Sequence, residues 1–190
     1  GREAGHALGS ISIELTLSAF GKEKVVVFSG DLGPDALAVL KDSHPFTRAD
    51  LVIMESTYGD HDHKSLQETL REGGEIIRNS LQKKGKILVP AFALGRTQQI
   101  LFYLARAIDR GKLPELEVYL DSPMAIEATR IYLKYPELFD ADMNELYNSG
   151  VVKGDLSRIH TTESSEESKA INEVEGPCMI IAGSGMCNAG

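Results

Sequence analysis

The sequence contains few of the residues and segments that mark disulfide-rich, secreted or membrane proteins. It has no tryptophan and only two cysteines, Cys178 and Cys187, among its 190 residues. Two cysteines are too few for a disulfide framework and fit a reducing compartment such as the cytoplasm. No apolar run approaches the roughly 20 residues of a membrane-spanning helix, so we expect no membrane association. We also find no basic and apolar leader of the kind that directs secretion.

Positive charge is scarce as well. The chain carries 20 lysines and arginines against 28 aspartates and glutamates, which gives a net charge of −8. A general nucleic-acid coat needs a basic surface, so this balance argues against one. It leaves room for an enzyme that handles RNA in a local groove. The apolar content of 42% is ordinary for a chain that buries a core.

The pattern of apolar residues changes along the chain. The first part alternates as antiparallel strands do, and the remainder alternates strands with amphipathic helices, which predicts a mainly parallel sheet flanked by helices. The predicted strands cover 9–19 (half buried), 24–28, 49–54 (buried on both faces), 86–93, 116–121 and 177–185. The predicted helices cover 65–83, 95–110, 123–135 and 164–174. We place a boundary near residue 59, and because neither end looks like a natural terminus we expect a fragment of a longer protein.

Two apolar strands end in a carboxylate. Asp31 stands in "SGDLG" and Glu55 follows "LVIM" directly. On one interpretation, each is a turn residue with local hydrogen bonds to the backbone. On the other, both carboxylates serve a metal-dependent site, and the flanking glycines allow the backbone to approach it closely. His6, in the glycine loop "AGHALGS", is a turn residue on the first interpretation and a metal ligand on the second.

A pair of histidines follows Glu55. His61 and His63 form "HDH", and alternating histidines in an extended segment can bind one metal ion. A solvated loop is the alternative, and for His61 we favour it.

Three predicted strand ends are suited to anions. "PAFALGRTQQ" places Arg96 and Thr97 where a helix begins, "DSPMA" does the same with Ser122, and "AGSGM" offers Ser184 and Gly185. Helix N-termini and arginine favour phosphate, although Thr97 as a cap and Arg96 as a surface residue are the simpler alternative. The ends of parallel strands share one edge of a sheet, where ligands bind in such folds. The glycines of "AGSGM" do not match the G-x-G-x-x-G pattern of dinucleotide-binding sites.

Six motifs in this order resemble one known family. "AGHALGSISIEL", "SGDLG" and "ESTYGD" resemble the metallo-β-lactamase-fold proteins of the β-CASP family, which process RNA. "PAFALGRTQQIL", "YLDSPMA" and "IIAGSGM" resemble the inserted β-CASP domain of that family. The resemblance implies a partial metallo-β-lactamase domain over residues 1–59, the end of its αββα fold. It implies a β-CASP domain over residues 60–190, shortened at its C-terminal end.

The same resemblance implies roles for particular residues. His6 would bind one of two zinc ions, Asp31 would bridge both, and Glu55 would orient a catalytic histidine. His63 matches a histidine that often follows "ESTYG" in bacterial members, so it is a further candidate. The His-x-His-x-Asp-His motif that supplies most zinc ligands in the family is absent, and we expect it upstream of Gly1.

We therefore predict part of a zinc-dependent ribonuclease, inactive alone, acting as an endonuclease or a 5′-to-3′ exonuclease. Its predicted partner is RNA. The sequence does not decide whether the protein forms a homodimer. The predicted substrate-binding residues are Arg96, Thr97, Ser122, Ser184 and Gly185. Two alternatives remain: a family member that binds RNA without cutting it, and a plain α/β nucleotide-binding module.

Overall fold

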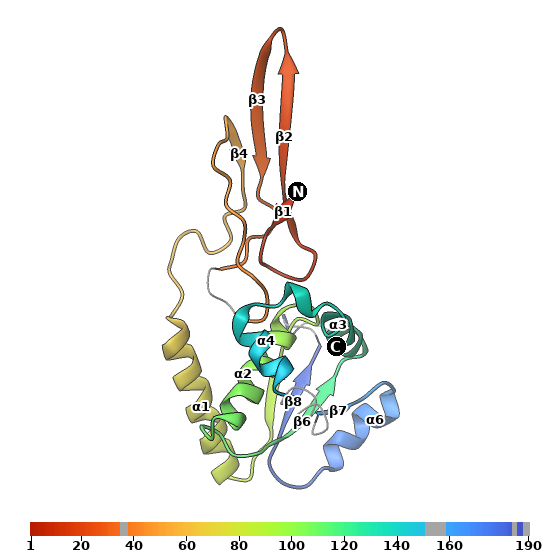
Figure 1. Cartoon of the computed structure of the whole chain (residues 1–190). Coiled ribbons are helices and arrows are strands. Elements are labelled where there is room, and N and C mark those ends of the chain that lie inside the picture. The colour runs from red at the N-terminus through yellow and green to blue at the C-terminus, as the bar shows by residue number, and fades with distance from the viewer. Residues whose placement is uncertain (35–37, 151–158, 184–185, 188–190) are drawn as a thin grey trace.

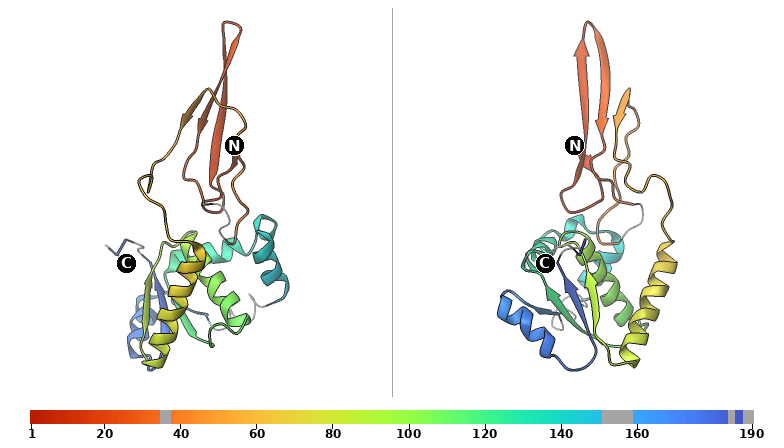
Figure 2. Two further views of the ribbon diagram at one scale, coloured as in Figure 1. Left: turned by 90° about the vertical axis from the view of Figure 1, so that its left-hand side faces the viewer. Right: turned by 180° about the vertical axis from the view of Figure 1, so that it is seen from behind.

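The described part of the chain is built around two separate four-stranded sheets. The computed structural model describes residues 1–34, 38–150, 159–183 and 186–187. In Figure 1 a long β-hairpin stands away from a body of helices around the second sheet, and the two views of Figure 2 show the same arrangement.

The first sheet follows the alternating part of the sequence. Its strands, in spatial order, are β1 (Arg2–Glu3), β2 (Ile11–Ala19), β3 (Lys22–Phe28) and β4 (Leu51–Ile53). β2 pairs antiparallel with β1 and β3, and β4 runs parallel to β3 with Val26 opposite Leu51.

Two predictions for this sheet were wrong. The apolar face of β2 is not half buried, because Ile11, Ile13, Leu15 and Leu17 are 42–54% exposed. β4 is not buried on both faces, since Leu51–Ile53 are 47–53% exposed. The cause is the same for both strands: Figures 1 and 2 show none of the labelled helices lying over this sheet.

The second sheet confirms the predicted parallel architecture. Its strands lie in the order β5 (Ile87–Pro90), β8 (Cys178–Ala182), β6 (Glu117–Asp121) and β7 (Ile159–Thr161). Each neighbouring pair is parallel. The last of these strands in the chain, β8, therefore lies inside the sheet and separates β5 from β6.

Helices flank this sheet. They are α1 (Leu66–Gln82), α2 (Arg96–Asp109), α3 (Pro123–Tyr132), α4 (Ala141–Asn148) and α6 (Ser165–Ala170), with 3₁₀ turns η1 (Pro136–Leu138) and η3 (Ile171–Glu173). The predicted helices over 65–83 and 95–110 are confirmed. The one over 123–135 ends earlier, at Tyr132, and the one over 164–174 becomes 3₁₀ after Ala170. α4, β7 and the two-residue β1 were not predicted. No helix within the described ranges is long and apolar enough to cross a membrane.

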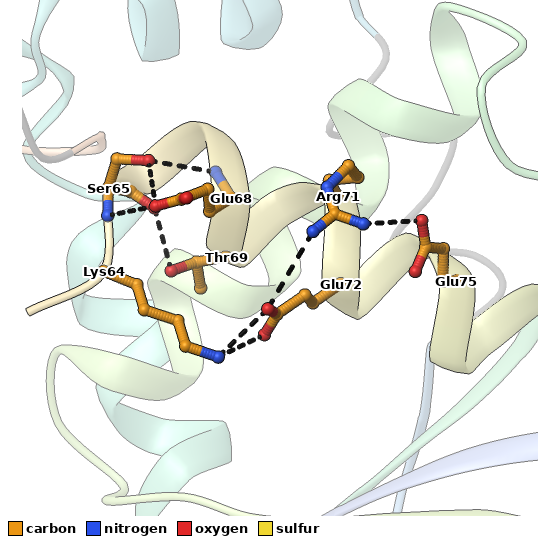
Figure 3. A network of polar contacts seen from close by, with 7 residues as sticks. All are labelled: Lys64, Ser65, Glu68, Thr69, Arg71, Glu72 and Glu75. Carbon is orange, nitrogen blue, oxygen red and sulfur yellow. Dashed lines mark hydrogen bonds and ion pairs between the residues drawn. The ribbon is translucent and has the colours of Figure 1, made fainter.

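The start of α1 shows how the sequence fixes a helix boundary. Ser65 accepts a hydrogen bond from the Glu68 N–H, and the Glu68 carboxylate accepts one from the Ser65 N–H (Figure 3). This reciprocal pair is a capping box. Lys64 pairs with Glu72 at 2.8 Å and Arg71 with Glu75 at 2.8 Å, so the exposed first turns are also linked by ion pairs.

Two apolar clusters hold the body together. The first lies between one face of the second sheet and helices α1, α2 and α3, and its largest fully buried members are Leu120 and Ile181. The second contains Ala38, Val39, Phe102, Tyr132, Phe139, Met143 and Leu146.

This second cluster joins the two parts of the chain. Val39 is 3% exposed within it, and its N–H donates to Asp140 at 3.1 Å. Leu40 forms an isolated bridge with Phe139. Residues 38–40 thus pack on the second part although they precede residue 59.

Candidate functional site

His6 lies in a tight loop between β1 and β2. Gly5 and Gly9 have φ of 72° and 83°, a conformation that favours glycine. Ser10 closes the loop, because its hydroxyl donates to the Ala7 carbonyl at 2.8 Å and accepts from the Ala7 N–H at 3.1 Å. The Leu8 N–H donates to the Tyr132 hydroxyl at 2.9 Å, which attaches the loop to α3.

Asp31 lies in the turn that follows β3, directly against the His6 loop. The Gly33 N–H donates to the Ala4 carbonyl at 2.9 Å. A Cβ atom added at Gly33 would lie 2.1 Å from the Gly5 carbonyl oxygen, so only glycine allows the two loops to approach this closely. As a result His6 Nε2 and Asp31 Oδ2 are 3.9 Å apart.

Glu55 follows β4 and is joined to the Asp31 turn through Ser29. The Glu55 N–H donates to Ser29 Oγ at 3.3 Å, and the Ser29 N–H donates to the Ile53 carbonyl at 2.9 Å. Ser12, only 1% exposed, donates its hydroxyl to the Ser29 carbonyl at 2.6 Å. Ser29 therefore fixes the spacing between the two strand ends that carry carboxylates.

The local environment favours the charged form of Glu55. The Thr57 hydroxyl and the Thr57 N–H, which lies 3.1 Å from Oε2, hold the pKa of Glu55 below its usual value. The Leu32 N–H and the charge of His6 act in the same direction. His6 and Asp31 thus lie side by side, with Glu55 near them on a third loop, and the metal-binding and catalytic roles of all three remain predictions.

The donor atoms in this group suit zinc but do not complete a site. Two ligand atoms on one tetrahedral zinc ion lie about 3.3 Å apart, so the 3.9 Å between the His6 nitrogen and the Asp31 oxygen is close to what a shared ion requires. A closed site needs four ligands. Within the described residues no group of three or more histidine, cysteine or acidic side chains is arranged to hold a metal ion.

The start of α2 lies beside the same loops. A Cβ atom added at Gly95 would lie 3.6 Å from the His6 carbonyl oxygen. The helix-start amides already have internal acceptors: the Gly95 N–H donates to Gln98 Oε1 at 2.7 Å and the Arg96 N–H donates to the Leu94 carbonyl. The exposed Arg96 side chain, rather than these amides, is therefore the group that α2 offers to an anion.

Thr97 has a structural role. It is 1% exposed, and both its N–H and its hydroxyl donate to the Phe92 carbonyl. This geometry does not favour its predicted contact with substrate, because little of its surface is accessible.

Ser122 is similarly enclosed at the start of α3. It is 8% exposed, and its hydroxyl accepts from the Ala125 N–H as a helix cap. The neighbouring Asp121 accepts hydrogen bonds from Thr162 at 2.6 Å and Ser168 at 2.9 Å. Ser184 and Gly185, the remaining predicted substrate residues, lie outside the described residues.

The histidine pair forms a small aromatic group. The rings of His61 and His63 pack edge-on against Tyr58, with centroids 5.4 Å and 4.7 Å from it. His61 Nδ1 lies 2.6 Å from Asp60 Oδ1. A metal-binding role for His63 remains a prediction.

Comparison with known proteins is consistent with this geometry. Residues 97–190 match the Beta-Casp domain. Over 99% of its length the chain is 38% identical to "Ribonuclease TTHA0252" of Thermus thermophilus. It is 31% identical, over 98% of its length, to "RNase J-like protein" of Methanocaldococcus jannaschii. It is 32% identical over 98% of its length to "Transcription termination factor FttA" of Methanosarcina mazei.

The chain is shorter than all three relatives. It spans 42% of the two ribonuclease-named proteins and 30% of the termination factor. The matched domain covers the C-terminal half, with β6, β8 and the helices around them, and the relatives match from the first loop onward. Residues 97–190 therefore belong to the Beta-Casp domain family, and over nearly its whole length the chain is similar to proteins named as ribonucleases.

Proposed function

We propose that this chain is part of a zinc-dependent ribonuclease. The convergence of His6, Asp31 and Glu55 beside the start of α2 is the observation that carries the proposal. Two relatives are named as ribonuclease or RNase J-like, and one is named as a transcription termination factor, so all three names concern RNA or its synthesis.

In this proposal the residues of the chain have distinct tasks. His6 and Asp31 would hold zinc together with ligands from another part of the protein, with Asp31 as the bridge between two ions. Glu55, whose carboxylate is held charged by Thr57, would orient a histidine from outside the chain. When bound, zinc polarises the phosphate and activates water for cleavage.

The substrate would follow the C-terminal edge of the parallel sheet. Arg96 would contact its phosphates with a forked, charge-assisted hydrogen bond. We assign Thr97 and Ser122 to the support of this edge, because both are buried and bonded to the backbone. Ser184 and Gly185 stay candidate phosphate contacts. The two cysteines are free, which is consistent with a cytoplasmic protein. The same proposal includes a homodimer.

Two substitutions in the whole protein test this function. Asp31→Ala should abolish zinc-dependent RNA cleavage and lower the zinc content, whereas Glu55→Gln should slow turnover strongly with zinc content nearly normal. Both variants should keep the far-ultraviolet circular dichroism spectrum of the parent, because both side chains lie in surface loops.

Each result discriminates between functions. Parallel loss of zinc and activity in Glu55→Gln would make Glu55 a zinc ligand instead of an orienting residue. A wild-type protein that binds RNA but never cuts it, with or without zinc, would favour a non-catalytic RNA-binding member. A protein with no affinity for RNA would end the proposal.

A further inference from the structure

The loop after β5 presents apolar side chains to solvent. Phe92 is 56% exposed and Leu94 is 51% exposed, and the exposed Arg96 follows two residues later. The exposed side chains are those of alternating residues, while Ala93 between the first two is half-buried and Gly95 between the last two is buried. Two exposed apolar side chains followed by a cation form a local surface unlike the acidic average of the chain.

This loop is held in place from inside. The Phe92 carbonyl accepts from the Thr97 N–H at 3.3 Å and from Thr97 Oγ1 at 2.8 Å. Gln98, which is 5% exposed, donates to the Ala93 carbonyl at 3.1 Å and accepts from the Gly95 N–H. The backbone that carries Phe92 is thus fixed, so little conformational entropy would be lost when its ring binds a partner.

Apolar side chains also follow the neighbouring strands at this edge. Met124, after β6, is 72% exposed and Met186, after β8, is 71% exposed. Because β8 lies between β5 and β6, the C-terminal ends of these three strands are adjacent along one edge of the sheet. The edge therefore offers an aromatic ring, flexible apolar side chains and the Arg96 charge together.

We propose that Phe92 is a stacking surface for a base of unpaired RNA, with Arg96 contacting an adjacent phosphate. Every base has a flat face that stacks on an aromatic ring, and stacking beside positive charge is how proteins bind single strands without reading sequence. A base within a duplex has both faces covered, so this surface would favour unpaired segments. The inference rests on the proposed function, since it names the form of RNA at the same site.

The test measures binding of a short uridine-rich RNA to the whole protein, in an Asp31→Ala background that prevents cleavage. Phe92→Ala should weaken binding about 5- to 150-fold, the range for loss of one stacked base, and Phe92→Trp should retain affinity. Phe20→Ala is the matched control, because Phe20 is fully exposed at the turn between β2 and β3. That variant should bind as the parent does.

A second measurement separates stacking from a general loss of binding. In this measurement single bases are removed from the RNA one position at a time, leaving the sugar and phosphate. Removal at one position should weaken binding to the parent. Removal at that same position should not weaken binding to Phe92→Ala any further. Unchanged affinity in Phe92→Ala, or equal sensitivity to base removal in parent and variant, would overturn the inference while leaving the proposed function intact. A change in oligomeric state with RNA affinity unchanged would assign the surface to a protein contact instead. Absence of any RNA binding by the parent would end both proposals.

Discussion

At the scale of single residues, the candidate site depends most on a glycine. Gly33 bears no chemistry, yet it is the point at which the Asp31 turn touches the His6 loop. A contact of 2.1 Å between an added Cβ and backbone atoms cannot be relieved by rotating a side chain, so one of the two loops must move. Such sites are sensitive to a single methyl group.

We expect Gly33→Ala to separate His6 from Asp31. In the whole protein this variant should lose zinc and RNA cleavage, and amide exchange should rise in residues 4–10, measured by mass spectrometry. Gly73→Ala is the control, because Gly73 lies in α1 with no atom within 4 Å of the added Cβ. That change should be neutral or stabilise the helix by about 0.5–1 kcal/mol. Unchanged exchange and zinc content in Gly33→Ala would contradict the packing argument.

At the scale of elements, local sequence signals determine where helices begin. The capping box at Ser65 satisfies amides that the first turn of α1 leaves without partners. We expect Ser65→Ala to cost about 1 kcal/mol, with faster amide exchange in the first turn of α1. Ser65→Asp should restore protection, because aspartate is an equally good cap. If the alanine and aspartate variants exchange alike, the cap does not hold this turn.

Asp50 joins β3 to the start of β4 through charge. Its carboxylate accepts from Lys24 Nζ at 2.7 Å and from the Val25 N–H at 2.9 Å. These bonds, the one from Lys24 first, hold the pKa of Asp50 below its usual 3.8. A lowered pKa means that the folded state favours the charged form. Its contribution is therefore fully present above pH 3.8 and is lost as the pH falls through the lower, folded-state value.

We accordingly expect β3 to lose amide protection in acid, below pH 3.8, after correction for the intrinsic pH dependence of exchange. In Asp50→Asn the protection of β3 should be lower at neutral pH and should depend less on pH over this range. Glu23→Gln is the control, because it removes another carboxylate from β3 without touching the bonds that Lys24 and Val25 donate to Asp50. Equal acid dependence in parent and Asp50→Asn would show that another group controls the strand.

The elements that could be predicted are those whose signal is local. α1 and α2 are long, with strong helical spacing of apolar residues and clear starts, and the alternation of strand and helix is sufficient to predict the parallel sheet. α4 and β7 were missed because they are short and lie within a polar stretch. The burial of β2 and β4 was wrong because an apolar strand needs a partner layer, which local pattern cannot reveal.

The sequence was sufficient to name the titratable residues of the candidate site, but not the residues that hold them in position. His6, Asp31 and Glu55 stand at strand ends or in a glycine loop and resemble a known family, so they could be named. Ser29 and Gly33 could not, since a serine or glycine in "SGDLG" is equally typical of any turn. The sequence could not decide whether Thr97 and Ser122 cap helices or contact substrate, because a helix cap and an anion site share the same residue types.

At the scale of the whole molecule, the described residues bring two candidate zinc ligands together, His6 and Asp31, and no group of three or more. We therefore expect the 190-residue chain by itself to hold no native dinuclear zinc site, because a tetrahedral ion would be half satisfied. Metal analysis after dialysis should find well below two zinc ions per chain. About two tightly held ions per chain would contradict this, and would mean that the chain supplies ligands that neither the sequence nor the described residues reveal.

The order of strands in the second sheet has a consequence for synthesis on the ribosome. β5 and β6 leave the ribosome well before β8, yet they are not hydrogen-bonded to each other and meet only through it. Until residues near 182 have been made, the apolar face with Ile87 and Val118 has no central strand to complete it. The nascent chain must therefore carry an open sheet edge until almost the whole of this sequence has been translated, a state in which long-range pairing is slow and aggregation is a hazard.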